Sequence, residues 1–229
     1  MNLVIALVTL LVVFGANTVV RADNAAPQTK ENAFYSSVPT GYMDDPRRVE
    51  WQQPEKVLDH LLIKSGEVVA DIGAGTGYFT MLFAKRVGKG GTVYAVDVEE
   101  SMVNLIVKRA KKEGYANVKG TLAYFDDPTL PKGAIDLIFI CDTYLFFENR
   151  EEYLLRLRDR LKSTGRLAIV SFNYKADIPG APPRHKMVPK EQTVAEMAKA
   201  GFMLEADYLF LPYQDFLLFT KRQRTKETL

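Results

Sequence analysis

The sequence is poor in the side chains that cross-link a chain or hold a metal. Its 229 residues include one cysteine, Cys141, which excludes an internal disulfide and a cysteine-based metal cluster. The two histidines, His60 and His185, lie far apart in the sequence and form no ligand pair with each other. We therefore predict no metal site.

The sequence also lacks an excess of charge of one sign. The formal net charge is +2, whereas a nucleic-acid-binding domain usually carries a basic face and a high pI. We therefore expect no nucleic-acid partner. Basic residues gather near the end of the chain, where residues 222–229 are interpreted as a solvated basic tail.

The longest uncharged apolar stretch is residues 2–20, and two interpretations of it stay open. A secretory signal fits the apolar core and the small residues around Ala22, although no Lys or Arg precedes the core. A membrane anchor also fits, because this length is at the short end of a bilayer span. Arg21 and Lys30 would then keep the main domain cytoplasmic. We assign residues 1–22 to a signal or anchor, so the protein is expected to be secretory or periplasmic, or membrane-associated with a cytoplasmic domain.

The rest of the chain alternates strand and helix patterns. Residues 23–44 are polar and are interpreted as a linker or cover segment, and residues 45–221 as one domain. A helix is expected from Asp45, restarting at Pro54 with Leu62 on its apolar face. The expected strands end with two joined by a short connection, which predicts a mostly parallel sheet with an antiparallel component. The strands are expected at 68–71, 92–97, 118–122, 135–141, 167–172, 202–210 and 216–220.

The most informative stretch is Asp71-Ile72-Gly73-Ala74-Gly75-Thr76-Gly77, which follows a buried apolar strand. Open α/β folds keep their ligand crevice at such a strand end, and glycines let a ligand approach the backbone. The dinucleotide fingerprint has a different spacing, and an aspartate beside the turn would repel a pyrophosphate. This aspartate suits a ligand that carries an ammonium group.

A second carboxylate, Asp97, ends the next predicted strand, 20 residues after Gly77. This is about the offset at which an acid meets the ribose hydroxyls in nucleotide-binding α/β units. The segments V-V-A-D-I-G-A-G-T-G-Y-F and V-Y-A-V-D-V-E-E-S-M resemble the first two motifs of class I S-adenosylmethionine-dependent methyltransferases. With the closing Leu211-Pro212-Tyr213-Gln214, the chain is similar to small proteins related to the ubiquinone and menaquinone C-methyltransferases.

The resemblance spans about residues 45–221 and implies a fold, a cofactor and a binding site. The implied fold is a Rossmann-like, doubly wound, seven-stranded α/β sheet, mostly parallel with one antiparallel strand. The implied cofactor is S-adenosylmethionine, and the acceptor is a small molecule or lipid-like. The residues implied in cofactor binding are Asp71, Gly73, Gly75 and Gly77 for the methionine portion, Asp97 for the ribose, Val98 for the adenine ring and Asp126, with Asp127 as its rival, for the adenine amino group.

Catalysis is expected at the end of the fourth strand, where Asp142 and Tyr144 are the candidates. Methyl transfer mainly requires alignment and the exclusion of water, so no fixed triad identifies the catalytic groups. Relatives often carry histidines at the positions of Leu145 and Phe146, and this chain lacks them. Trp51, with Tyr35 and Tyr42, is a further candidate for an aromatic lid over the cofactor.

Two alternatives to an active methyltransferase remain. The first is an NAD(P)-dependent Rossmann oxidoreductase, because Tyr115 and Lys119 match the Tyr-x-x-x-Lys spacing of short-chain dehydrogenases. Gly114 and Asn117 break the helix that this pair would need to share a face. The second is a catalytically inactive homologue that binds S-adenosylmethionine, which the missing histidines suggest.

Overall fold

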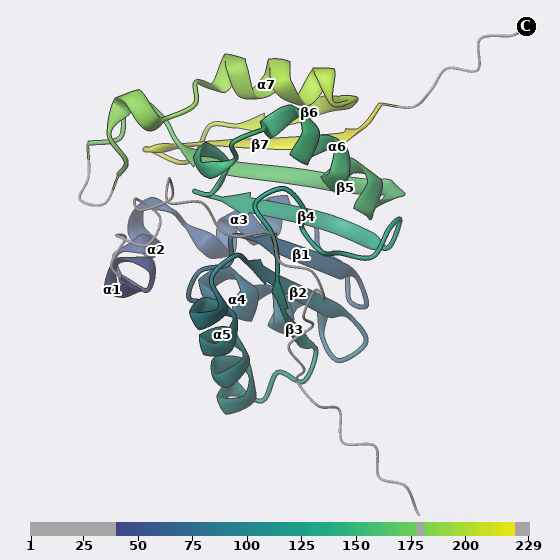
Figure 1. Ribbon diagram of the computed structural model, residues 1–229. Helices are drawn as coiled ribbons and strands as arrows, with labels where there is room; N and C mark the ends of the chain where they lie inside the picture. The colour runs from purple at the N-terminus through teal and green to yellow at the C-terminus, as the bar shows by residue number, and fades with distance from the viewer. Residues whose placement is uncertain (1–39, 178–180, 223–229) are drawn as a thin grey trace, which may run out of the picture.

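A single seven-stranded sheet runs through the part of the chain that the computed structural model describes, residues 40–177 and 181–222 (Figure 1). The strands stand side by side in the order β3-β2-β1-β4-β5-β7-β6. Their bounds are β1 (Val68–Ile72), β2 (Thr92–Asp97), β3 (Val118–Leu122), β4 (Ile135–Cys141), β5 (Leu161–Phe172), β6 (Phe202–Tyr208) and β7 (Gln214–Lys221).

The sheet has the predicted topology. Strands β3, β2, β1, β4 and β5 pair in parallel, whereas β7 is antiparallel to both β5 and β6. The strand order reverses between β1 and β4, and in doubly wound sheets a ligand crevice lies at the carboxyl ends of the strands at this point. This confirms the Rossmann-like fold with one antiparallel strand.

Helices cover both faces of the sheet. Strand residues alternate between the two faces, so Val69 packs in the core under α3, α4 and α5, whereas Ala70 packs in the core under α6 and α7. The helices are α1 (Thr40–Met43), α2 (Arg48–Trp51), α3 (Pro54–His60), α4 (Tyr78–Val87), α5 (Glu100–Glu113), α6 (Arg150–Arg160) and α7 (Lys190–Lys199), with short 3₁₀ turns η3 (Tyr144–Phe146) and η4 (Arg184–Lys186).

Several local expectations were wrong at element boundaries. The helix expected from Asp45 begins at Arg48, as α2, and the strand expected at 202–210 ends at Tyr208. The strand expected at 167 begins at Leu161, where Lys162 leaves the helix pattern and forms an ion pair of 2.7 Å with Asp136. The strand expected at 216 begins at Gln214, which is buried in spite of its polar side chain. Leu62 lies beyond the end of α3 with a φ of 50° and is 74% exposed, so it is not on the buried face of that helix.

The terminal expectations fall outside the described residues. These include the signal or anchor at 1–22, most of the segment 23–44 and nearly all of the tail 222–229. Within residues 40–177 and 181–222, no helix has the length and apolar character that crossing a membrane requires.

Candidate functional site

The candidate site is a cleft at the carboxyl ends of β1, β2 and β4, made of two adjoining pockets. Both pockets are lined by Gly73, Thr143 and Phe146. The larger, pocket A, lies between the glycine turn, the end of β4 and the segment that carries α1 and α2. The smaller, pocket B, lies between the end of β2 and the loop after β3. The cleft therefore has the elongated form that a two-part ligand requires.

Asp71 lies at the end of β1, lines pocket A and is almost fully buried. Its Oδ2 accepts a hydrogen bond of 2.6 Å from the Thr80 hydroxyl at the start of α4. Burial raises the pKa of Asp71 to about 7, against the lowering effect of the Thr80 hydrogen bond, and the nearby charge of Asp97 raises it further. An ammonium group in pocket A would favour the ionised form.

Asp97 ends β2, lines pocket B and is also buried. Its Oδ2 accepts from the backbone N–H of Gly75 at 2.8 Å, and its Oδ1 accepts from the N–H of Glu99 at 3.0 Å. The carboxylate therefore joins the glycine turn to the start of α5. Val98 follows it, lines pocket B and packs against the core under α6. The sequence-predicted residues at β1 and β2 thus meet in one cleft.

The glycine turn needs glycine most clearly at Gly73. Its φ is 69°, and a Cβ placed there would lie 2.2 Å from the Thr143 hydroxyl oxygen. The β1 turn and the β4 turn therefore approach more closely than any other residue allows. Gly75 lines pocket A beside Met43, and Gly77 leads into α4.

Asp142 lines pocket A just after β4, in a left-handed backbone conformation with a φ of 54°. Its carboxylate accepts from the side-chain amide of Gln214, at 2.8 Å and 2.9 Å for the two oxygens, and from that of Gln52 at 3.3 Å. Burial raises the pKa of Asp142 to about 6, and the charge of Arg48 and these amide donors limit the rise. The group is therefore poised to change its protonation near neutral pH.

The segment over pocket A contributes residues that sequence reasoning missed. Arg48 is buried in α2 and stacks its guanidinium 4.1 Å from the centre of the Tyr78 ring. Trp51 and Tyr42 line the same pocket, as the lid hypothesis expected, whereas Tyr35 lies outside the described residues. No sequence pattern indicates a role for Arg48, because an arginine on a short helix is usually expected to be a solvated surface residue.

Tyr144, the second catalytic candidate, is buried in η3 and does not line either pocket. Its hydroxyl donates to Glu196 Oε2 on α7 at 2.6 Å, and Arg150 contacts the same carboxylate at 2.8 Å. Burial and the Glu196 carboxylate raise the pKa of Tyr144 above its ordinary range. A catalytic role for Tyr144 stays a prediction, and the contacts join α6, η3 and α7.

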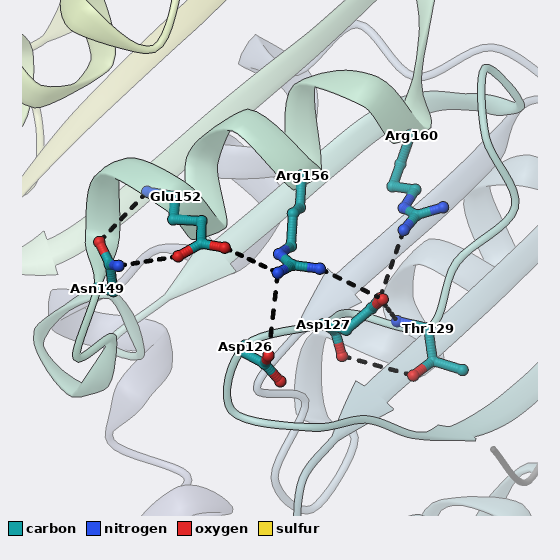
Figure 2. A network of polar contacts seen from close by, with 7 residues as sticks. All are labelled: Asp126, Asp127, Thr129, Asn149, Glu152, Arg156 and Arg160. Carbon is teal, nitrogen blue, oxygen red and sulfur yellow. Dashed lines mark hydrogen bonds and ion pairs between the residues drawn. The ribbon is translucent and has the colours of Figure 1, made fainter. Parts of the chain in front are cut away.

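Asp126 lies outside the linings of both pockets, in a network that joins the loop after β3 to α6 (Figure 2). Its side chain is 75% exposed and is 3.9 Å from Arg156. Asp127 faces Arg160 at 3.5 Å and caps the turn through the N–H of Thr129 at 2.8 Å. Figure 2 shows both aspartates turned toward α6. A contact of Asp126 with adenine stays a prediction.

The same loop nevertheless shapes pocket B. Tyr124 and Phe125 line this pocket immediately before the two aspartates. The N–H of Tyr124 donates to the carbonyl oxygen of Asp127 at 2.9 Å, which closes the loop on itself. The contacts of Asp126 and Asp127 with the arginines of α6 therefore anchor the loop that forms one wall of pocket B, although neither aspartate lines the pocket.

The residues present fit S-adenosylmethionine. Pocket B is lined mainly by apolar side chains, including Val98, Phe125 and Phe147, which suits a flat adenine ring, and Asp97 stands beside it. In pocket A, the buried hydroxyl oxygens of Tyr42 and Thr76 have no hydrogen-bond partner among the described residues. Buried polar atoms rarely stay unpaired, so these two hydroxyls point to a polar ligand group.

Replacing Asp71 with asparagine is expected to stabilise the protein above neutral pH. The folded chain holds the Asp71 proton up to about pH 7, whereas the unfolded chain releases it near 3.8, so stability falls as pH rises through this range. An amide cannot ionise and still accepts from Thr80. Urea unfolding at pH 8 should give a free energy of unfolding higher by roughly 1–3 kcal/mol in the variant, with no difference near pH 4. Lower stability of the variant at pH 8 would contradict this.

Comparisons with known proteins agree with this geometry. The sequence profile described as a methyltransferase domain matches residues 63–224. The ubiquinone/menaquinone biosynthesis C-methyltransferase of Hydrogenovibrio crunogenus is 37% identical over 112 residues, covering 48% of this chain and 44% of the relative. Nocamycin O-methyltransferase of Saccharothrix syringae is 29% identical over 127 residues, covering 55% and 45%. The chain thus spans about half the length of these curated relatives.

A solved structure matches over more of the chain. A SAM-dependent methyltransferase from Aquifex aeolicus superposes with a TM-score of 0.74 at 29% identity, covering 79% of this chain and 95% of that one. The profile match covers most of the domain predicted at 45–221 and includes both acidic strand ends. The chain therefore belongs to the methyltransferase-domain family of S-adenosylmethionine-dependent methyltransferases.

Proposed function

We propose that the chain binds S-adenosylmethionine across pockets A and B and transfers its methyl group to a small-molecule acceptor that enters pocket A. The observation that carries this proposal is the pair of buried carboxylates, Asp71 and Asp97, at neighbouring strand ends on either side of the glycine turn. Relatives named nocamycin O-methyltransferase and aklanonic acid methyltransferase support a small-molecule acceptor.

Each part of the cleft would hold one part of the cofactor. Asp97 would accept from the ribose hydroxyls, and the apolar wall of pocket B would pack on the adenine ring. Asp71 would face the ammonium group of the methionine portion. Arg48, Tyr42 and Thr76 offer donors for its carboxylate, which is consistent with the two unpartnered hydroxyls.

The cofactor supplies a methyl group already activated by a sulfonium, so this chain mainly has to align the acceptor and exclude water. The side chains of Trp51, Phe172 and Phe146 give pocket A apolar walls that suit an acceptor with an apolar body, including a lipid-like one. Asp142 is the acidic group placed to accept a proton from the acceptor. Leu145 and Phe146 line the same pocket, so the missing histidines are replaced there by apolar surface.

The sequence alone supports a further proposal about location. We propose that residues 1–22 export the domain as a signal, or hold it at a membrane as an anchor. Under the anchor interpretation, the domain stays on the side where S-adenosylmethionine is made.

Calorimetric titration of the full chain tests the cofactor. We expect S-adenosylhomocysteine to bind with one site per chain and NADH not to bind, because Asp71 beside the glycine turn would repel a pyrophosphate there. Binding of NADH without S-adenosylhomocysteine would favour the oxidoreductase and refute the proposal. Failure to label any acceptor from methyl-labelled cofactor, despite binding, would favour the inactive homologue.

A further inference from the structure

A buried chain of polar side chains connects the segment over pocket A to the end of β4. Arg48 Nε donates to Gln52 Oε1 at 2.7 Å. The Gln52 amide nitrogen donates to Gln214 Oε1 at 3.2 Å and to Asp142 at 3.3 Å. The Gln214 amide nitrogen donates to both oxygens of Asp142. Each amide therefore accepts through its oxygen from one neighbour and donates through its nitrogen to the next. This series of hydrogen bonds ends at the Asp142 carboxylate.

The two glutamines are fully or almost fully buried, and they come from different parts of the fold. Gln52 follows α2 and Gln214 begins β7, 162 residues away in the sequence. Buried polar groups are costly unless every member of the network is paired, and apolar side chains of the same volume would fill this space at lower cost. The presence of two buried amides points to a task that apolar packing does not perform.

The backbone conformation of Asp142, where this series of hydrogen bonds ends, is also unusual. Asp142 takes a left-handed conformation directly after β4, while its N–H donates to the carbonyl oxygen of Val170 on β5 at 2.8 Å. Residues held in this region cluster at binding and catalytic sites, where the surrounding structure keeps them in place. Here the surrounding structure includes the pair of amides, which contact the carboxylate from the residue after α2 and from the start of β7.

We propose that Gln52 and Gln214 are positioning residues that hold the Asp142 carboxylate, in its ionised form, in the lining of pocket A. This inference rests on the proposed function, because pocket A is assigned there to the acceptor. Arg48 extends the arrangement to α2, so the segment that covers the pocket and the candidate proton acceptor share one set of hydrogen bonds.

Hydrogen bonds donated to a carboxylate favour its charged form, and burial opposes it. The other charged or titratable groups that act on Asp142 are Arg48 from α2, Cys141 from β4 and Tyr42 from α1. Arg48 favours the ionised form, and burial together with Asp142 raises the pKa of the Cys141 thiol, so the thiol stays neutral. The thiol also donates to Asp142 Oδ2, at 3.6 Å. Removing either amide therefore tests the proposal without altering a formal charge and with this longer contact still available.

The test is the titration of the Asp142 carboxyl, followed by NMR in the ligand-free full chain with ¹³C-labelled aspartate. Gln214→Leu should raise its pKa from about 6 by about one unit or more, because both oxygens lose a donor. Gln52→Leu should raise it by less, since it removes one longer contact. Gln192→Leu is the matched control, because Gln192 is exposed on α7 and should leave the titration unchanged.

An unchanged Asp142 titration in both buried variants would overturn the proposal, even if their stability falls, because a structural role alone lowers stability without moving that pKa. Should Gln214→Leu fail to fold, Gln52→Leu decides, since the contacts of Gln214 with Asp142 remain. The readout needs no cofactor, so loss of the proposed function would appear separately as absent S-adenosylhomocysteine binding. In active protein, the acidic limb of the rate profile should move upward by the same amount.

Discussion

Replacing Asp97 with alanine is expected to weaken the binding of S-adenosylhomocysteine at least about 100-fold. Hydrogen bonds to a charged group contribute about 1.5–3 kcal/mol each, and a ribose diol offers two, so the expected loss is about 3 kcal/mol or more. The variant also frees the N–H of Gly75, which Asp97 holds at 2.8 Å, and this loosens the turn between the two pockets. Calorimetric titration at fixed salt and pH measures the effect.

Asp136→Ala is the matched control. Asp136 is a partly buried aspartate near the amino end of β4, away from the candidate site at the carboxyl ends of the strands. It accepts from the N–H of Val68 at 2.9 Å and pairs with Lys162. Its loss should lower stability without changing affinity. Equal affinity of wild type and Asp97→Ala would remove the central support for the proposed cofactor site, whatever the stability of the variant.

The sequence predicts the fold well wherever local patterns are strong. The predicted strands 118–122 and 135–141 agree with β3 and β4 at both ends, and each begins shortly after a turn-forming residue, Asn117 or Gly133. Prediction failed at the start of β5 and β7, where polar residues continue the strand because Lys162 and Gln214 find partners on β4 or just beyond it. No local sequence pattern indicates these tertiary partners of Lys162 and Gln214.

The candidate site divides in the same way. The glycine turn and Asp97 could be predicted, because the candidate ligand-binding groups lie within short sequence segments with a fixed spacing. The roles of Arg48, Gln52 and Gln214 could not be predicted from the sequence. Their contacts form only when the fold brings residues far apart in the sequence together. Asp126 illustrates the converse: the resemblance implies a contact with the adenine amino group, whereas its side chain faces Arg156 (Figure 2).

Gly73→Ala is expected to destabilise the protein by roughly 2–5 kcal/mol and to abolish cofactor binding. Two penalties add: a positive φ that costs about 1–2 kcal/mol for a residue with a Cβ, and a clash in a packed region that costs about 1–3 kcal/mol. The clash is with Thr143, whose nearest atoms would lie 2.2 Å, 2.3 Å and 2.7 Å from the new Cβ. Thermal unfolding should show a midpoint lower by roughly 4–20 °C.

Gly114→Ala separates the two penalties. Gly114 ends α5 with a φ of 80° and has open space around the position of a Cβ, so its variant should lose only the conformational share, about 1–2 kcal/mol. Adding Thr143→Gly to Gly73→Ala should recover part of the lost stability, since it removes all three clashing atoms. Equal destabilisation by Gly73→Ala and Gly114→Ala would mean that the turn after β1 can move away from Thr143. The close approach of the two turns, which fixes the boundary between pockets A and B, would then not be a rigid feature of the site.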